Sequence, residues 1–490
     1  MTGGQDVTDL VVLLGNEILK RIDKEYPHVT LGFYSYSAHA DYPARYKPHP
    51  RISVTFADIT FSRFHDFDDQ NSKSRAYYRD IIEQWGQLSR EQGNPLFFRG
   101  YNWNLAENMM PFTRLKTWGV DIPFYKKMGF LGCSVEASKA WSANGPHDYL
   151  LMKLLWNTAL DWKQVLHDYC RKSFGDGGPA MGRYYLRLVE TQRAAGQEAG
   201  SYHAIHLIFN EAFVLESEKD IAQALAAAKA EDQRVRIRFA AGAFEALKLY
   251  LSFHQATMDF DFSAAKTRFE AMLAHWEKQY ALNPDLAAKQ APQYLHRFLD
   301  KFVEEADRYS AEPYGIVLRL PDELRTCFDP NNAGNRMRFQ NPAVNDAQFI
   351  KTKTYSTTWD AQGLSGYRSG AVWYRFRFAL PKDAAGQPIG LFVGAVDDEA
   401  RVWINGQPVG TSGQRFSAPA VFDLTDGIHY DAENLLAIQV VRNSSANELG
   451  TGGILRPSFL FTGPRLAEKA PKPLELRRVL PGGELGESEK

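Results

Sequence analysis

Residues 1–158 show two kinds of hydrophobic pattern that alternate along the chain. Residues 10–26 carry apolar side chains at helical spacing, and their stripe consists of Val11, Leu14, Ile18 and Ile22. Further helical patterns cover 77–90 and 118–128, and four short runs of β-forming residues are predicted to be strands at 30–37, 51–58, 95–103 and 129–136. Strands that alternate with helices indicate a parallel sheet with helices outside it.

The number of strands limits the architecture of this region. A (β/α) barrel of the TIM type has eight strands, whereas the pattern of residues 1–158 gives four. We therefore expect one of two arrangements. The region is either the C-terminal half of such a barrel, in a truncated chain that lacks the first half, or an open sheet of four strand–helix units.

The pattern changes twice after residue 158. Residues 159–312 are rich in helix formers with few breakers, so we expect a helical domain whose apolar stripes pack in a bundle. Residues 315–465 contain strands of alternating pattern and a hairpin signal at Asn405-Gly406, which predict a β-sandwich. Residues 466–490 are rich in Pro, Glu, Lys and Gly and are expected to be disordered. The expected fold class is multidomain α/β plus β.

Composition and charge argue against several classes of function. The net charge of −1 leaves no basic excess for nucleic-acid binding, and no window approaches the roughly twenty apolar residues of a membrane span. The three cysteines form no CxxC spacing, so neither a zinc site nor a disulfide scaffold is expected. No phosphate loop, dinucleotide fingerprint or GxSxG motif occurs in the sequence, and no cofactor is expected. The opening residues MTGGQDVTDL lack the features of a signal peptide. Taken literally, this chain is therefore predicted to be cytoplasmic.

The C-terminal region resembles a galactose-binding-like jelly roll, the fold of the sugar-binding domain at the front of many β-glycosidases. The resemblance rests on VDDEARVWINGQPVG at 396–410, FDLT at 422–425, ENLLAIQVV at 433–441 and GGI at 452–454. It implies a sandwich in a carbohydrate-related protein. It says less about ligand binding, because many such domains only brace a catalytic barrel.

Residues 6–188 resemble the bacterial family called domain of unknown function 4838. The matching pieces include LGFYSYSAHADYPARYKPHPRISV, KKMGFLGCSVEAS and AMGRYYLRL. That family is similar to α-glucuronidases and other glycoside hydrolases that have (β/α) barrels followed by helices. The resemblance implies a member that starts late in the barrel, and it implies a secreted or periplasmic protein that acts on polysaccharide.

Two carboxylates stand where a glycosidase needs them, at the ends of predicted strands. Glycosidases use an acid and a base or nucleophile on either side of the scissile bond, and in a barrel these groups lie at the C-terminal ends of strands. Glu136 follows an apolar strand, where burial would raise the pKa of a carboxyl group and suit it to proton donation. Asp58 is the candidate partner that stays ionised. The alternative for each is a structural carboxylate at a strand end.

Candidate substrate-binding residues follow the first and third strands. They are Tyr36, His39, Arg99, Tyr101, Asn102 and Trp103. By strand alternation Arg99, Tyr101 and Trp103 share one face, which we expect to line the barrel, and Asn102 lies opposite. Arg99 can clamp a uronic-acid carboxylate, and Trp103 can stack on a sugar ring. The alternative is a set of structural aromatic residues.

The segment FHDFDDQN at 64–71 places a histidine and three aspartates close together. Its spacing matches no full calcium or magnesium loop, so we expect a solvated acidic loop and no metal. The leading hypothesis is a glycoside-hydrolase-like protein that acts on polysaccharide, with a uronic acid as one candidate substrate, by carboxylate acid/base catalysis. The open alternative is a non-catalytic carbohydrate-binding protein or an inactive fragment of such an enzyme. The sequence does not settle the oligomeric state.

Overall fold

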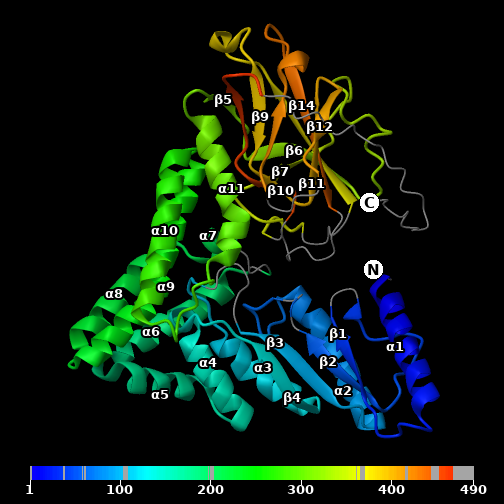
Figure 1. Ribbon diagram of the computed structural model, residues 1–490, viewed down its shortest axis with the longest axis vertical. Coiled ribbons are helices and arrows are strands. Elements are labelled where there is room, and N and C mark those ends of the chain that lie inside the picture. The colour runs from blue at the N-terminus through cyan, green and yellow to red at the C-terminus, as the bar shows by residue number, and fades with distance from the viewer. Residues whose placement is uncertain are drawn as a thin grey trace.

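The N-terminal part of the chain is a four-stranded parallel sheet (Figure 1). The computed structural model describes residues 3–36, 39–57, 59, 62–102, 109–196, 198, 204–359, 361–364, 370–413, 418–442 and 452–466. The strands lie side by side in chain order, and they are β1 (Leu31–Ser35), β2 (Ile52–Ala57), β3 (Leu96–Tyr101) and β4 (Phe130–Glu136). This confirms the predicted parallel sheet. Among the described residues the sheet is open and does not close into a barrel.

One face of this sheet is covered by helices. They are α1 (Gly3–Ile22), α2 (Lys73–Gln92), α3 (Leu115–Lys127) and α4 (Trp141–Trp156). Alternate strand residues, among them Val54, Phe56 and Phe98, are buried against this layer in one core with Trp85 and Trp118. Complete burial of such side chains contributes roughly 1.5–3 kcal/mol each, so this face supplies most of the stability of the sheet.

The opposite face of the sheet carries small, polar and aromatic side chains. Gly100 shows which face is which, because a Cβ there would lie 3.1 Å from Trp118 of α3. By alternation the other face bears Arg99 and Tyr101 on β3, and Tyr34, which is 51% exposed, on β1. Parallel sheets are normally covered on both faces, whereas among the described residues no helix packs on this one, which we call the uncovered face, so it is the feature of the fold that bears most on function.

Helix α1 turns part of its apolar surface outward. Val12 and Leu19 are buried, whereas Leu14 and Ile18 of the predicted stripe are exposed. Val7 and Leu10 extend the same outward stripe by one turn. The helix therefore presents apolar side chains on two sides, and only one of them packs on the sheet. Within the described residues no helix is both long and apolar enough to cross a membrane.

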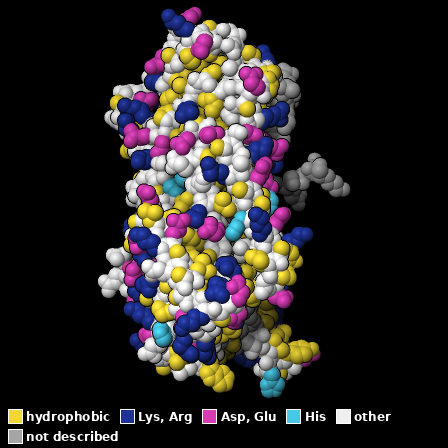
Figure 2. All heavy atoms as spheres, turned by 90° about the vertical axis from the view of Figure 1, so that its left-hand side faces the viewer, with side chains coloured by type: hydrophobic (Ala, Val, Ile, Leu, Met, Phe, Trp, Pro, Cys, Tyr) yellow, Lys and Arg dark blue, Asp and Glu magenta, His cyan; other side chains and the backbone are white. Residues whose placement is uncertain are grey.

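Seven further α-helices follow α4 among the described residues. They are α5 (Trp162–Phe174), α6 (Gly178–Ala194), α7 (Ile205–Ile208), α8 (Glu211–Ala227), α9 (Glu231–Met258), α10 (Phe262–Leu282) and α11 (Gln293–Ser310). Helices α9, α10 and α11 run along one side of the molecule toward the C-terminal sheets (Figure 1). Side chains of both charge signs interleave on the face seen in Figure 2, so this face carries no single-sign patch.

The C-terminal region consists of antiparallel sheets. A six-stranded sheet has the order β12-β11-β14-β8-β6-β7, a four-stranded sheet has the order β13-β9-β16-β5, and β10 pairs with β15. The bounds are β5 (Gly315–Arg319), β6 (Glu323–Asp329), β7 (Ile350–Lys353), β8 (Gly370–Phe378), β9 (Ile389–Val393), β10 (Ala395–Val396), β11 (Glu399–Ile404), β12 (Gln407–Thr411), β13 (Ala420–Asp423), β14 (Asn434–Arg442), β15 (Ile454–Arg456) and β16 (Phe459–Thr462). Asn405 and Gly406, with φ of 53° and 84°, form the predicted hairpin turn between β11 and β12.

Contacts between aromatic rings join helices α10 and α11 to the four-stranded antiparallel sheet β13-β9-β16-β5. The ring centroids of Tyr309 on α11 and Phe461 on β16 lie 4.8 Å apart, and those of Phe262 on α10 and Phe459 lie 5.3 Å apart. These rings belong to the same hydrophobic core as the parallel sheet and its helices. The helices and this sheet are therefore packed together rather than tethered.

Candidate functional site

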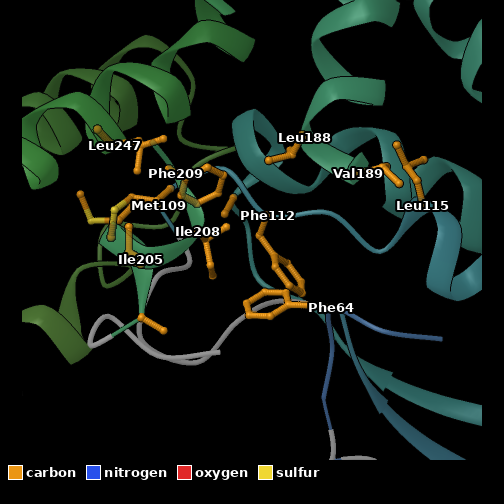
Figure 3. Close-up of a cluster of buried hydrophobic side chains, with 14 of the residues drawn as sticks. Phe64, Met109, Phe112, Leu115, Leu188, Val189, Ile205, Ile208, Phe209 and Leu247 are labelled. Carbon is orange, nitrogen blue, oxygen red and sulfur yellow. The ribbon is translucent and has the colours of Figure 1, made fainter. Parts of the chain in front are cut away.

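The segments that follow β2 and β3 pack beneath the helical region. Phe64 follows β2 and Phe112 follows β3, and their rings point toward one another with centroids 6.0 Å apart (Figure 3). Met109, Ile205 and Leu247 extend the cluster to α7 and α9. The C-terminal ends of the central strands are thus anchored by apolar packing, which gives a fixed frame to the polar groups beside them.

Arg99 and Glu136 form an ion pair on the uncovered face of the sheet. Arg99 Nη2 donates to Glu136 Oε2 at 2.6 Å, and Nη1 donates to Ser134 Oγ at 2.9 Å. The register of β3 and β4 pairs Arg99 with Ser134 and Tyr101 with Glu136, so the guanidinium reaches diagonally to the last residue of β4. The side chains are 30% and 38% exposed, and the pair is open to a ligand.

Tyr101 forms the wall beside this ion pair. The guanidinium of Arg99 lies 5.8 Å from the ring centroid of Tyr101, and that of Arg63 lies 5.6 Å from it. Burial and the neighbouring Tyr36 raise the pKa of Tyr101. On β2 the residue in register with Arg99 is Ala57. The structure brings Arg99, Tyr101 and Glu136 together, with Tyr36 beside Tyr101.

Asn102 lies on the opposite face, where it connects strands to helices. Its side-chain amide donates to Asp148 of α4 and accepts from the Trp118 indole of α3. Its backbone N–H donates to the Glu136 carbonyl at 2.8 Å, and its own carbonyl accepts from His147 Nε2 at 2.9 Å. Asn102 is 1% exposed. It therefore holds the end of β4 in place and is not available to a substrate on the uncovered face.

The acid–base groups around Asn102 are shaped by burial. Burial raises the pKa of Asp148 to about 7 and lowers the pKa of His147 to about 3. Since His147 Nε2 donates to a carbonyl, its Nδ1 is the bare nitrogen, and it has no partner among the described residues. Both shifts follow from taking charge-bearing groups out of water.

His39 is a second substrate-binding candidate, after Asn102, that the structure keeps apart from Arg99, Tyr101 and Glu136. Its ring lies against Phe33, with centroids 5.9 Å apart, and Phe33 faces the helix-covered side of the sheet. Burial lowers the pKa of His39. Two further candidates, Asp58 and Trp103, lie outside the described residues.

Most of the acidic segment after β2 is buried, so the prediction of a solvated loop is wrong except at Asp68, whose side chain is 70% exposed. His65, Asp66 and Asp69 are at most 9% exposed. Arg193 of α6 pairs with both aspartates, its Nη2 lying 3.2 Å from Asp69 Oδ2. The partner lies 127 residues beyond Asp66 along the chain, so local spacing gave no sign of it. Across the described residues no group of three or more His, Cys, Asp or Glu side chains could hold a metal ion.

Two contributors to the site were not among the predicted residues. Ser134 accepts from Arg99, and Arg63, which is 8% exposed, lies over Tyr101. Strand alternation signals Ser134, because it stands two residues before Glu136 on the same face. Arg63 is in an irregular segment, where periodicity gives no such signal.

Comparisons with known proteins divide the chain into two matched regions. Residues 2–186 match the family described as Domain of unknown function (DUF4838). This matched region includes β1–β4 and α1–α5. Residues 343–446 match the family described as Beta-galactosidase second all-beta domain. The Arg99–Glu136 pair lies in the first region.

Individual relatives match shorter parts. A beta-glucuronidase of Formosa agariphila is 39% identical over 71 residues, which are 14% of this chain and 7% of that protein. Among solved structures, a β-glucuronidase from Ruminococcus gnavus in complex with D-glucuronic acid shares 16% identity at a TM-score of 0.25, over 30% of this chain and 29% of that one. Another structure, described as Ruminococcus gnavus beta-glucuronidase, shares 16% identity at a TM-score of 0.27, over 31% of this chain and 29% of that one. The chain thus spans less than a third of the length of these relatives.

Proposed function

We propose that this chain is a glycoside-hydrolase-like protein that acts on uronic-acid glycosides. It carries a DUF4838 domain over residues 2–186 and a β-galactosidase-type all-β domain over residues 343–446. The observation that supports this most is the ion pair of Arg99 and Glu136, beside Tyr101, on the uncovered face at the ends of parallel strands. In a (β/α) barrel the carboxyl ends of the strands carry the active site.

The four parallel strands are proposed to be half of a (β/α) barrel. Their uncovered face would then be its interior, and β1 and β4 would be paired by further strands. Exposed apolar side chains flank both edges of the sheet. Leu10 and Leu14 are exposed on α1 beside β1, and Leu155 and Trp156 are exposed on α4, which follows β4. Further β/α units would bury these side chains.

Glu136 is proposed to be the base or nucleophile of the reaction. Its carboxylate accepts a hydrogen bond from Arg99 Nη2 at 2.6 Å, and a carboxylate oriented in this way can attack the anomeric carbon or activate water. This differs from the role as acid that its position after an apolar strand suggested. The glycosidic C–O bond would break, water would supply the new oxygen at the anomeric carbon, and an acid would protonate the leaving oxygen. Asp58, which the sequence led us to expect as the ionised partner, would then have to take the opposite role and act as that acid.

Arg99 is proposed to recognise the carboxylate of the uronic acid. A guanidinium binds carboxylates in a two-pronged geometry, and this one already holds a carboxylate at 2.6 Å. The substrate carboxylate would replace Glu136 as a partner of Arg99. That exchange would release Glu136 for the sugar, and it would favour uronides over neutral glycosides.

Hydrolysis of 4-nitrophenyl α- and β-D-glucuronides by the full chain tests this function. The Glu136→Gln variant is expected to lose at least about a hundredfold in kcat/KM if Glu136 acts on the reacting atoms. Glu83→Gln is the matched control, since Glu83 is also a partly exposed glutamate paired with an arginine. Release of nitrophenol at the same rate by the Glu136→Gln variant would remove Glu136 from the chemistry.

The second candidate is carbohydrate binding without hydrolysis. It is favoured by the ion pair of Glu136 with Arg99, because a carboxylate that is already paired is less suited to act on a glycosidic bond. Arg99 and the ring of Tyr101 would still offer a surface for binding a glycan. A glycan array separates the two functions. Retention of uronide-containing glycans with no hydrolysis product would support the binding protein over the enzyme.

A further inference from the structure

The parallel sheet ends in two strands that are each paired on one side only. Among the described residues β1 pairs with β2, β4 pairs with β3, and neither edge strand has a second neighbour. All four strands are parallel, so the two edges run in the same direction. An edge strand presents backbone N–H and C=O groups that another strand can pair. Each edge is therefore able to take one further parallel strand.

Exposed apolar side chains flank both edges on the helix-covered side. Helices α1 and α4 lie at opposite ends of the row of strands (Figure 1). On α1, Leu10 and Leu14 are 62% and 61% exposed, in line with Val7 and Ile18. On α4, Trp156 is 93% exposed, and Met152 and Leu155 are exposed beside it. Apolar patches of this kind mark interaction surfaces. Each of the two helices thus has a side that another helix would bury.

The uncovered face between these edges carries rings next to small side chains. One row across the sheet follows the strand register, in the order Tyr34, Thr55, Phe97 and Gly132. Tyr34 is 51% exposed, and Phe97 and Thr55 are partly exposed. The interior of an eight-stranded barrel is filled by inward-facing side chains of this spacing. The row is therefore suited to pack against facing strands.

We propose that a second copy of this chain covers this face, with a twofold axis parallel to the strands that pairs β4 of each copy with β1 of the other. The eight strands then close into one barrel, and neither copy keeps an open edge. The same rotation turns the two uncovered faces toward one another and brings α1 of each copy beside α4 of the other. This inference rests on the half-barrel proposed above, and it names the partner that completes it.

A second copy meets requirements that a smaller occupant does not meet. A single added strand or peptide would pair one edge and leave the other open, whereas the chain carries both complementary edges itself. Four strands from each copy give the eight that a TIM-type barrel has. The net charge of −1 opposes self-association only weakly. The Arg99–Glu136 pairs of both copies then open into one interior, so strands of each copy complete the site of the other.

The mass of the full chain in solution, measured by light scattering over a concentration series, tests the proposal. We expect the mass of two chains. Leu14→Glu on α1 and Trp156→Glu on α4 should each raise the dissociation constant of the dimer at least about tenfold, because each buries a charge between the helices. Leu282→Glu is the matched control, since Leu282 is 68% exposed at the end of α10. All three positions are exposed within one chain, and unchanged thermal unfolding of the monomer would confirm that the variants fold.

Cross-linking between two singly substituted chains locates the contact. Ile18→Cys lies on α1 and Leu155→Cys lies on α4. A mixture of the two chains, treated with a short bismaleimide, should give a cross-linked pair that contains one chain of each kind. Neither variant alone should exceed the parent chain, whose partly exposed Cys133 and Cys327 set the background.

Three results would overturn the second-copy proposal. They are the mass of a single chain at every concentration, a dimer that only one of Leu14→Glu and Trp156→Glu weakens, and a mixture that cross-links no more than the parent chain. None of these measurements depends on hydrolysis. A single chain that hydrolyses nitrophenyl glucuronides would overturn the dimer and leave the proposed function, and a cross-linked dimer without hydrolysis would do the reverse.

Discussion

Arg99 and Glu136 meet across neighbouring parallel strands although 37 residues separate them in the sequence. Their side chains are 30% and 38% exposed. An ion pair this exposed contributes at most about 1 kcal/mol to stability. The pair is therefore better explained by what it offers a ligand than by what it adds to the fold, and this motivates the proposed uronide chemistry.

Substitution of Arg99 is predicted to change substrate preference. Arg99→Met should raise KM for a nitrophenyl glucuronide by roughly 10–100-fold, since a charge-assisted hydrogen bond to the carboxylate is lost. KM for the matching glucoside should change much less. Arg90→Met, an exposed arginine at the end of α2, is the control. Equal loss for glucuronide and glucoside would argue against carboxylate recognition by Arg99.

Asp148 is predicted to make the folded state less stable as pH rises. Its folded pKa of about 7 lies above the ordinary aspartate value of 3.8, so between these pH values the folded chain binds more protons than the unfolded chain. Stability from this group is fully present below about pH 4 and declines toward pH 7, by no more than about 1.4 kcal/mol per pH unit. Urea unfolding at several pH values should show that Asp148→Asn lacks this decline.

Comparison with the parent chain isolates the effect of Asp148. His147 and His254 have pKa values lowered to about 3, so they oppose it, adding stability as pH rises through the same range. Both histidines are present in the parent and in Asp148→Asn. If the two chains show parallel stability curves between pH 4 and 7, the assignment of the raised pKa to Asp148 is wrong.

The buried ion pair of Arg75 and Asp121 is predicted to matter more for stability than any surface pair. Arg75 Nη1 lies 2.7 Å from Asp121 Oδ2, and the two side chains are 0% and 1% exposed. Asp121→Ala should lower the free energy of unfolding by about 3–5 kcal/mol, because it leaves Arg75 buried without this partner. Glu83→Ala, which removes an exposed pair with Arg79, should cost less than about 1 kcal/mol. Similar midpoints in urea would contradict this difference.

Strand periodicity predicted much of the site. The two-residue repeat placed Arg99 and Tyr101 on one face and Asn102 on the other, which the structure confirms. It could not give the register between β3 and β4, and so it could not show that Arg99 reaches Glu136. Register depends on packing between segments far apart in sequence.

Burial of polar segments was the part that the sequence did not predict. The charges of Asp66 and Asp69 indicated solvent, but their partner Arg193 is brought in by α6. On α1 the apolar pattern showed a helix without showing that Leu14 would be exposed and Val12 buried. In both cases the decisive information is tertiary: which other element lies against the segment.

The measurement that tests the central claim most directly is turnover of nitrophenyl glucuronides by Glu136→Ala with and without added sodium formate. If Glu136 supplies the carboxylate for the reaction, turnover should fall by at least about a hundredfold, and formate, entering the vacated space beside Arg99, should restore part of it. Turnover by Glu136→Ala equal to that of the parent chain, or no hydrolysis of either anomer by the parent chain, would contradict the proposed catalytic function.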